Sequence, residues 1–325
     1  MSRDVLVVGA GMAGLTLATA RAAAGDRVTV VDKGRRHGGR MATRRADDVA
    51  YDTGVPTFAA HSDTFRAAVA DWVAQGHAEE LPDAGGGARR VRGRPTMRSL
   101  PTALAETSGA EVVLATTVVG LDVTGGRWHV AVEEGRDAPS TTVRTADVLV
   151  LTCPAPQAVT LLRGAPGLAD PATLARLEAV SYAPCLAVLA RPSDPAAMPA
   201  ATGVAAAPRT ILADATFSAA HLDGDRAAAA RYVAIRASEQ DGVALEVVHV
   251  HGWRYAQVAR GLDVPALRDD TAGAPLVIAG DLCTAHVELP DPSSAEGVER
   301  AFLSGRAAAA LVGPRSNEEA GRWNR

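Results

Sequence analysis

Three glycines near the start of the chain have the spacing of a phosphate-binding turn. Gly9, Gly11 and Gly14 follow a short apolar, β-branched run at residues 4–8 and precede an Ala- and Leu-rich helical pattern that extends to about Ala24. Glycines at such positions allow a tight turn, a close approach of the backbone to a pyrophosphate, and close packing of the helix on the strand. The free N–H groups and the positive dipole end of that helix would then bind the pyrophosphate of a dinucleotide.

A carboxylate follows this turn at the spacing at which dinucleotide sites bind a ribose. Gly25-Asp26 interrupts the helical pattern, and the next apolar run, residues 27–31, ends at Asp32, which lies 23 residues after Gly9. Glycine spacing alone is weak evidence, but strand, helix, strand and acid in this order are specific, so we predict a dinucleotide site. The other interpretation is a cleaved signal peptide. It is disfavoured because cleavage would remove the first strand and because Asp4 interrupts the charged region.

A second pair of glycines lies shortly after Asp32, in the sequence Gly38-Gly39-Arg40. At this place, backbone N–H groups and a guanidinium can approach the same pyrophosphate. The alternative is an ordinary basic loop, which we disfavour because the glycines follow the second strand, where phosphate groups are expected.

Four ring side chains alternate along a strand-like run near the end of the chain. His249, His251, Trp253 and Tyr255 are all odd-numbered, so an extended strand would place them on one face. Two imidazoles, an indole and a phenol on one face suit a planar, partly charged substrate. Two alternatives stay open: an edge strand with partly exposed rings, and a bulge at Gly252 that breaks the face.

The other reactive residue types exclude several kinds of chemistry. Lys33 is the only lysine of the chain, so no second lysine is available for Schiff-base chemistry. Cys153, Cys185 and Cys283 form no CxxC pair, which predicts buried, reduced thiols in a reducing cytoplasm. No cluster of His, Cys, Asp and Glu has metal-ligand spacing, so we predict no metal site.

Composition sets the size and the class of the protein. The chain has 325 residues and a net charge of −4, which is enough chain for one large core or two coupled domains. The mild acidity argues against nucleic acid as the main partner. Because no stretch of about eighteen apolar residues lacks Gly, Pro or charge, we expect no segment that crosses a membrane.

The predicted elements alternate between strands and helices. Helices are expected at residues 62–75, 99–108 and 297–312, and strands or strand-like runs at 118–123, 128–132, 146–151, 185–190, 232–237, 244–251 and 275–281, with a hairpin turn at Gly125-Gly126. This order predicts an α/β fold, in which a discontinuous Rossmann-like domain carries an inserted, mixed α+β substrate domain. We assign residues 1–75, 96–160 and 273–313 to the first domain, 76–95 and 161–272 to the second, and 314–325 to a flexible tail.

Six motifs in order resemble the FAD-binding, amine-oxidase-like flavoproteins, and within them the renalase-like FAD-dependent oxidoreductases. These motifs are Gly9-x-Gly-x-x-Gly14 with Asp32, Gly38 to Arg45 with Tyr51-Asp-Thr-Gly54, Pro154-Ala-Pro-Gln157, Leu177-x-x-Val-x-Tyr-x-Pro-Cys185, Trp253-Arg-Tyr-Ala256, and Gly280-Asp281 with Val298-Glu-x-Ala-x-x-Ser-Gly305. The resemblance covers nearly the whole chain.

The resemblance implies FAD as the cofactor and a substrate domain that covers the flavin. Renalase-like enzymes, including the bacterial ones, oxidise reduced or isomeric dihydronicotinamide nucleotides, passing a hydride to the flavin and then electrons to molecular oxygen. Asp281 and Glu299 could form a pair of acids, but Gly-Asp after a strand favours a cofactor-holding role. The predicted substrate-facing, catalytic residues are His249, His251, Trp253 and Tyr255. The predicted cofactor-binding residues are Gly9, Ala10, Gly11, Met12, Ala13, Gly14, Asp32, Lys33, Gly39, Arg40, Met41, Ala42, Thr43, Gly54, Val55, Val118, Cys153, Pro154, Gly280, Asp281, Val298, Glu299 and Ala301.

Two departures from the family pattern leave the substrate open. Sixteen residues separate Asp281 from Val298, where relatives usually have a shorter link, and Arg300 stands where the family tends to have glycine. A second hypothesis is therefore the oxidation of a secondary amine or related small metabolite at a carbon–nitrogen bond, which the lack of a lysine near the flavin disfavours. A third is a flavin-bound scaffold or redox sensor without turnover.

Overall fold

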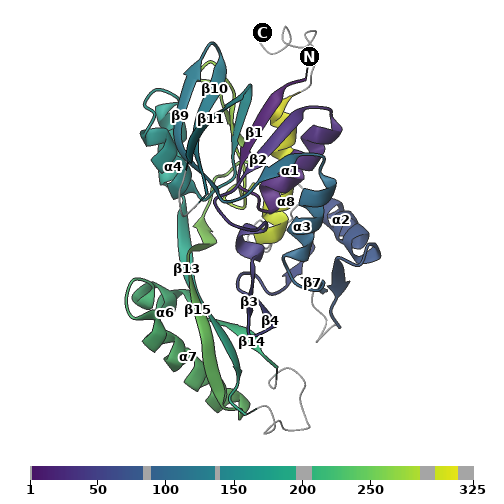
Figure 1. The fold of residues 1–325 in the computed structure, drawn as a ribbon, viewed down its shortest axis with the longest axis vertical. Coiled ribbons are helices and arrows are strands. Elements are labelled where there is room, and N and C mark those ends of the chain that lie inside the picture. Colours follow the sequence, from purple (N-terminus) through teal and green to yellow (C-terminus); the bar gives the residue numbers. More distant parts are fainter. Residues whose placement is uncertain (1, 83–88, 136–139, 195–206, 286–296, 314–325) are drawn as a thin grey trace.

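A six-stranded sheet forms the centre of the protein (Figure 1). The computed structural model describes residues 2–82, 89–135, 140–194, 207–285 and 297–313. The order of the sheet is β16-β17-β12-β1-β2-β8, with β1 at Asp4–Val8, β2 at Arg27–Val31, β8 at Glu111–Val113, β12 at Val148–Leu151, β16 at Leu267–Asp269 and β17 at Leu276–Ile278. β16 pairs antiparallel with β17, and the other pairs are parallel. The predicted α/β class is confirmed.

The first strand, helix and strand have the predicted form. α1 spans Met12–Ala23 and begins directly after the glycine turn. β1 and β2 are parallel, and Val8 is opposite Val31, so both strands end beside the N-terminus of α1. Both strands are nearly continuous apolar runs because a parallel sheet that is covered on both faces buries the side chains on each side of the strand.

The last helix packs against the first. α8 spans Gly297–Val312, as the sequence predicts, and lies beside α1 (Figure 1). A Cβ at Gly305 would lie 2.4 Å from the carbonyl oxygen of Ala13, so a larger residue would force the two helices apart. The end of the chain therefore supports the helix that carries the glycine turn.

A three-stranded meander packs beside the central sheet. Its strands are β9 at Thr116–Thr124, β10 at Arg127–Glu134 and β11 at Ser140–Ala146, followed by helices α4 at Ala155–Arg163 and α5 at Pro171–Glu178. Gly125 and Gly126 have φ of 61° and 72°, which a tight hairpin turn requires and which confirms the predicted turn. Trp128 is fully buried, and its indole N–H donates to the carbonyl oxygen of Pro275 at 2.9 Å.

Short elements connect β2 with the meander. They are the 3-10 helix η1 at Gly39–Met41, β3 at Thr43–Ala46, β4 at Val49–Asp52, β5 at Phe58–Ala59, α2 at Asp63–Ala74, β6 at Ala78–Glu80, β7 at Arg90–Gly93 and α3 at Ser99–Thr107. The hydroxyl of Ser62 accepts a hydrogen bond from the backbone N–H of Phe65 at 3.2 Å and caps α2. The rings of Phe65 and Trp72 pack on Phe302 of α8, with centroids 5.2 and 6.0 Å away.

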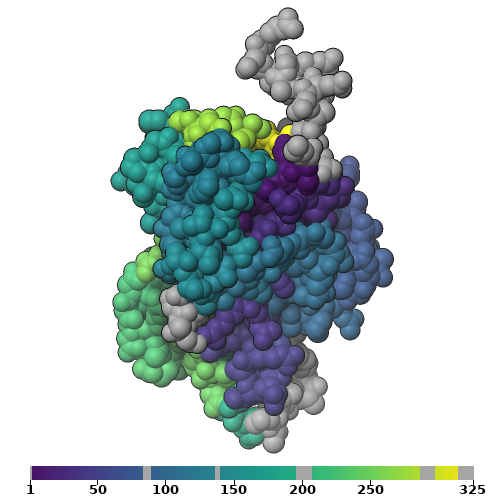
Figure 2. Space-filling model, turned by 45° about the horizontal axis from the view of Figure 1, so that its top comes forward, coloured from purple at the N-terminus to yellow at the C-terminus, as the bar shows by residue number. Residues whose placement is uncertain are grey.

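A second sheet extends away from the central one, in the lower half of Figure 1. It contains β13 at Ser181–Pro192, β14 at Arg209–Leu212 and β15 at Leu245–Arg260, in the order β14-β13-β15. Helices α6 at Ala215–His221 and α7 at Arg226–Asp241 cover one face. The β3–β4 hairpin lies at the other side, next to the green second sheet in Figure 1, and its purple atoms are at the surface in Figure 2.

The strand expected at residues 232–237 is wrong, because these residues lie inside α7. The four alanines at 227–230 lie in the first turns of this helix, and alanine has the highest helix propensity. Asp225 caps the helix by accepting hydrogen bonds from the N–H groups of Ala227 and Ala228, both at 3.0 Å. The run is strand-like in composition because it contains aromatic and β-branched residues such as Tyr232 and Ile235, whose side chains are exposed on the helix.

The division into two domains stays a proposal. β16 falls in the range assigned to the substrate domain, yet it pairs with β17 at the edge of the central sheet. β5 pairs with β7 across the proposed boundary near residue 76. The tail at 314–325 lies outside the described residues. In the described part of the chain, no helix has the length and apolar character needed to cross a membrane.

Candidate active site

The glycine turn forms an open cradle at the N-terminus of α1. Gly9 has a φ of +119°, a conformation that side chains disfavour, and its N–H donates to the carbonyl oxygen of Val31 at 2.8 Å. A Cβ at Gly14 would lie 2.0 Å from the carbonyl oxygen of Gly9, so helix and turn are in close contact. At Gly11, by contrast, a Cβ would meet no atom within 4 Å, and no side chain caps the helix there. The first N–H groups of α1 therefore face open space.

Asp32 and the second glycine pair lie against this turn. The Asp32 carboxylate accepts hydrogen bonds from the N–H groups of Ala10 at 2.7 Å and Gly34 at 2.6 Å. The N–H of Gly38 donates to the carbonyl oxygen of Ala10 at 2.9 Å. Gly39 has a φ of +51° and lies so close that its Cβ would be 3.8 Å from the Cα of Gly11. The structure thus brings together the two glycine motifs and the acid.

Arg40 connects the central sheet with the second sheet. Its guanidinium forms two hydrogen bonds with the Asp281 carboxylate, at 2.6 and 2.5 Å, and lies 3.4 Å from the carbonyl oxygen of Tyr255 and 3.5 Å from that of Ala256. Burial disfavours the charge on Arg40, but the contacts with Asp281 raise its pKa above the ordinary value. Arg40 is therefore charged, and it links the end of β17 to β15. Gly280, just before Asp281, has a φ of +143°.

Glu299 and Asp281 do not share their partners. Glu299 is fully buried in the first turn of α8, and its carboxylate accepts hydrogen bonds from the N–H and hydroxyl of Ser62, both at 2.7 Å, and from the N–H of His61 at 3.0 Å. These bonds fix α8 to the loop before α2. A cofactor-holding role for either acid stays a prediction.

The motif at Tyr51–Gly54 lies between Arg40 and β15. A Cβ at Gly54 would be 1.7 Å from the carbonyl oxygen of Arg40, so only glycine fits. The N–H of Thr53 donates to the carbonyl oxygen of Ala42 at 2.8 Å. The carbonyl oxygen of Thr53 accepts the indole N–H of Trp253 at 2.6 Å. Trp253 is therefore directed toward the loop that follows the second glycine pair.

His249, His251 and Trp253 keep the alternation of a regular strand. In the pairing with β13, His249 is opposite Leu189, His251 opposite Ala187 and Trp253 opposite Cys185, with no break at Gly252. The rings of His251 and Trp253 meet edge to face, with centroids 4.4 Å apart. A Cβ at Gly252 would lie 2.9 Å from Leu222 beside α6. The helices therefore cover the face of β15 that carries Gly252, and the three rings lie on the other face.

Tyr255 lies in an irregular part of β15. The register shifts between the pairs Cys185–Trp253 and Ala183–Gln257, and Tyr255 falls between them. Its ring packs edge to face on Tyr182, with centroids 5.4 Å apart. Tyr182 in turn accepts the N–H of Ala155 on its hydroxyl at 3.0 Å. The bulge thus occurs next to the predicted aromatic face and not at Gly252.

The two histidines are neutral at neutral pH. Burial lowers the pKa of His249 below its ordinary 6.5, and the charge of Arg44 adds to this effect. Burial also lowers the pKa of His251, together with His249, Arg44 and Arg226.

Several predicted cofactor residues contribute to packing around the cradle. One apolar cluster contains Phe65, Phe302, Met12, Met41, Val298, Val55 and Ala301. Val118 lies in the core beneath the meander. The hydroxyl of Thr43 donates to Asp52 at 2.6 Å, and Pro154 precedes α4 as its N-cap. Burial raises the pKa of the Cys153 thiol to about 12, so it stays protonated. Lys33 is exposed. Direct contact of these residues with a cofactor stays a prediction.

Four residues of the site escaped the sequence analysis: Thr53, Thr152, Tyr182 and Arg44. The hydroxyl of Thr152 donates to the carbonyl oxygen of Val8 at 2.9 Å, and a Cβ at Gly9 would lie 2.4 Å from that hydroxyl. Thr53, Tyr182 and Arg44 all occur inside quoted motifs, so the motifs pointed to their neighbourhood. Their contacts depend on pairing between distant segments, which a single sequence does not show.

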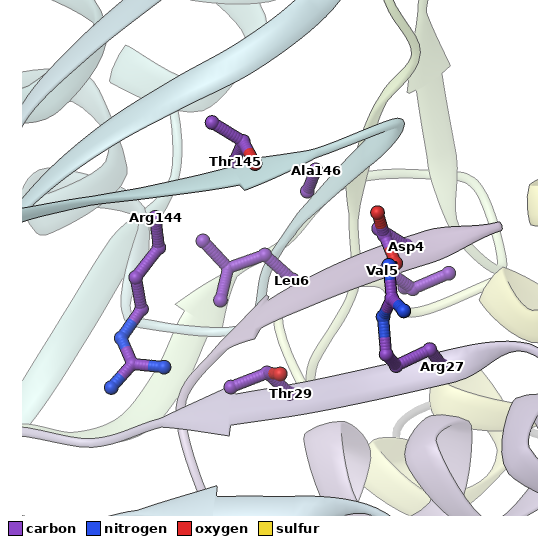
Figure 3. A pocket seen from close by; sticks show the side chains of 8 residues that line it. All are labelled: Asp4, Val5, Leu6, Arg27, Thr29, Arg144, Thr145 and Ala146. Carbon is purple, nitrogen blue, oxygen red and sulfur yellow. The ribbon is translucent and has the colours of Figure 1, made fainter.

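A depression between the central sheet and β11 of the meander is not part of this site. Its volume is about 210 Å³, and Asp4, Val5, Leu6, Arg27, Thr29, Arg144, Thr145 and Ala146 line it (Figure 3). Asp4 and Arg27 begin β1 and β2, so the depression lies away from the carboxyl ends of the strands, where ligands of parallel sheets bind. Arg27 pairs with Asp4, and Arg144 pairs with Glu134 at 2.8 Å.

Comparison with known families identifies the class of this site. The family model of the NAD(P)-binding Rossmann-like domain matches residues 7–72. The family model of the flavin containing amine oxidoreductases matches residues 62–260, more than half of the chain. The chain belongs to the flavin containing amine oxidoreductases. This flavin amine oxidoreductase is thus an FAD-dependent oxidoreductase, with FAD as cofactor and a small molecule as substrate.

Solved structures show the same fold over most of the chain. A candidate protoporphyrinogen oxidase from Exiguobacterium sp. 255-15 superposes with a TM-score of 0.63 at 13% identity, covering 96% of this chain and 99% of the other. An oxidoreductase from Methanosarcina mazei gives a TM-score of 0.61 at 9% identity, covering 91% and 98%. The anhydrotetracycline hydroxylase OxyS from Streptomyces rimosus gives 0.54 at 17% identity, covering 98% and 64%. At these identities, the likeness concerns the fold alone.

The cradle of this flavin amine oxidoreductase fits FAD. The space in front of Gly11, the uncapped N-terminus of α1 and the positive φ of Gly9 and Gly39 together leave room and donors for a pyrophosphate. Arg40 adds a cation at the same edge of the sheet.

Proposed function

We propose that this enzyme is renalase-like and oxidises a reduced or isomeric dihydronicotinamide nucleotide. Bound FAD supplies the acceptor for a hydride. In the overall reaction the substrate loses one hydride to become a pyridinium, and molecular oxygen takes up two electrons and two protons to give hydrogen peroxide. The chain's own residues then have to bind the ring, orient it and exclude water.

The face of β15 carries this proposal. The indole of Trp253 is held by Thr53, next to the cradle loop, and the His251 ring packs on its edge. A planar dihydropyridine could stack on or against such a wall. Burial lowers the pKa of both histidines, and hydride loss from a dihydropyridine requires no removal of a proton, so neither ring has to act as a base.

The cofactor roles that we propose follow the contacts of the cradle. The backbone of residues 9–14, Gly39 and Arg40 would hold the pyrophosphate, and Asp32 would hold the ribose. Asp281 would face the ribityl chain and orient Arg40 through their ion pair. The remaining predicted residues would shape the apolar surroundings. These residues come from segments 1–75 and 273–313, which supports a discontinuous FAD-binding domain.

An anaerobic stopped-flow experiment tests this function. The FAD-loaded enzyme is mixed separately with aged NAD(P)H, which contains isomeric dihydronicotinamides, with secondary amines and with hydroxy compounds, while the flavin absorbance is followed. We expect rapid bleaching by a dihydronicotinamide nucleotide and reoxidation when oxygen is admitted. Bleaching by amines alone would establish carbon–nitrogen oxidation instead. A flavin that only light or dithionite reduces would establish a protein without turnover.

A further inference from the structure

We propose that Arg44, together with His249 and His251, forms a binding site for an anionic group of the substrate, most simply a phosphate. The substrate class rests on the proposed function, since dihydronicotinamide nucleotides carry phosphate. The anion site itself is argued from the contacts between the β3–β4 hairpin and the second sheet. It lies outside the cradle that fits the pyrophosphate of FAD.

The hairpin directs Arg44 toward the second sheet. Arg44 is opposite Tyr51 in the antiparallel pair, so their side chains extend from the same face of the hairpin. At the tip, Asp47 forms an ion pair with Arg191 of β13 at 2.7 Å, and Tyr51 is buried within electrostatic reach of Arg191. Because Tyr51 is buried and β4 packs on β14, the face of the hairpin that carries Arg44 is the one directed toward the second sheet.

The two imidazoles lie on the face of the second sheet that is next to the hairpin. His249 and His251 lie on the face opposite to the one that α6 and α7 cover, since Gly252 is the residue in contact with Leu222. The hairpin runs along this stretch of the sheet, because Asp47 at its tip pairs with Arg191 and Thr53 at its base accepts the indole N–H of Trp253. Arg44 lies between these two contacts, and its charge contributes to the lowered pKa of both histidines. Arginine and neutral imidazole are both hydrogen-bond donors to phosphate oxygens.

Arg44 differs from Arg191 in having no carboxylate partner. Arg191 is paired with Asp47 and Glu246, so these carboxylates are already used. Within the described residues, Arg44 makes no ion pair, and its side chain is exposed. Its guanidinium is therefore available to an anionic group of the substrate, and a guanidinium can bind phosphate through two parallel hydrogen bonds.

A pair of adjacent arginines provides a matched test. Arg45 is also exposed and has the same charge, but it is the next residue of the strand, so its side chain leaves the opposite face. Calorimetric titration of the FAD-loaded protein with inorganic pyrophosphate should show binding that Arg44→Gln weakens about tenfold or more, because the charge-assisted hydrogen bonds of the guanidinium are lost. Arg45→Gln should leave it within about twofold. Equal weakening by both variants, or no binding to the parent, would overturn the site.

A second titration separates this site from the proposed function. Nicotinamide mononucleotide should bind the parent about tenfold more tightly than nicotinamide riboside, which lacks the phosphate, and Arg44→Gln should remove that preference. Pyrophosphate binding that depends on Arg44, without binding of either nicotinamide, would contradict the proposed function and leave the anion site standing. Equal affinities for both nicotinamides in the parent, with dihydronicotinamide bleaching the flavin, would contradict the anion site alone.

Discussion

Gly11 shows how the absence of a side chain makes room for a ligand. Gly9 and Gly14 are glycines because neighbouring atoms lie too close for a Cβ, whereas Gly11 faces open space. We expect Gly11→Val to abolish FAD binding while the protein still folds, because its branched side chain would occupy the place of the pyrophosphate. The ratio of flavin to protein absorbance after purification measures this. Gly224→Val, at an exposed position with similar open surroundings, is the control and should keep its flavin.

Trp253 is the residue whose loss should separate substrate binding from cofactor binding. We expect Trp253→Ala to lower the second-order constant of flavin reduction roughly 5- to 150-fold, equivalent to about 1–3 kcal/mol of lost stacking and orientation. Its FAD content should stay normal, because the cradle belongs to other segments. Trp253→Phe keeps a ring but loses the hydrogen bond to Thr53, so its constant of flavin reduction should lie between those of the parent and of Trp253→Ala. Reduction at the parent rate would place the substrate elsewhere, and a flavin-free Trp253→Ala protein would make Trp253 a core residue.

His251 should make the folded protein sensitive to mild acid. Its pKa is lowered by burial and by His249, Arg44 and Arg226, so the unfolded chain takes up a proton at a higher pH than the folded one. Stability is therefore full above the ordinary pKa of 6.5 and falls as the pH drops from there toward the lowered value. Urea unfolding at pH 7.5 and 5.5, with excess FAD, should show a smaller loss in His251→Asn than in the parent. An equal loss in both proteins would show that other groups cause it.

At the scale of elements, local patterns predicted most of the central sheet. β1, α1, β2, the hairpin at Gly125-Gly126 and α8 all have strong local signals, such as a buried apolar run, a glycine at a positive φ or a continuous helical period. The prediction at α7 failed because exposed aromatic and β-branched side chains have a high strand propensity, and only packing shows that this segment is a helix. The alternation of His249, His251 and Trp253 was visible in the sequence, but the bulge at Tyr255 depends on its pairing with β13.

Glu299 joins two of these elements, α8 and the loop before α2. Its buried carboxylate accepts hydrogen bonds from His61 and Ser62, and an amide would turn its NH2 group, which cannot accept, toward at least one of these donors. We expect Glu299→Gln to lower the free energy of unfolding by about 1–3 kcal/mol, measured by urea denaturation. Glu239→Gln, on the exposed surface of α7, should change it by less than about 0.5 kcal/mol. An unchanged Glu299→Gln protein would show that these bonds contribute little.

At the scale of the whole molecule, the reaction should require neither a lysine nor a metal ion. Lys33 is exposed, and the described residues contain no group of three or more His, Cys, Asp or Glu side chains arranged to hold a metal. We therefore expect dialysis against EDTA and the substitution Lys33→Arg each to leave the rate constant of flavin reduction within about threefold of the parent value. Stopped-flow measurement of both samples checks this, and a large loss after either treatment would require a different mechanism.

The contact between α1 and α8 also orders events during synthesis. The cradle begins at residue 9, among the first parts of the chain to leave the ribosome, but the glycine that lets α8 approach it, Gly305, is nearly 300 residues later. Arg3 similarly donates to the carbonyl oxygen of Val312 at 2.7 Å. The N-terminal segments leave the ribosome first, so the first strand and helix lack their packing partner until α8 has been synthesised. Cofactor capture is therefore expected as a late, post-translational step, and a nascent chain arrested before α8 would be an apoprotein.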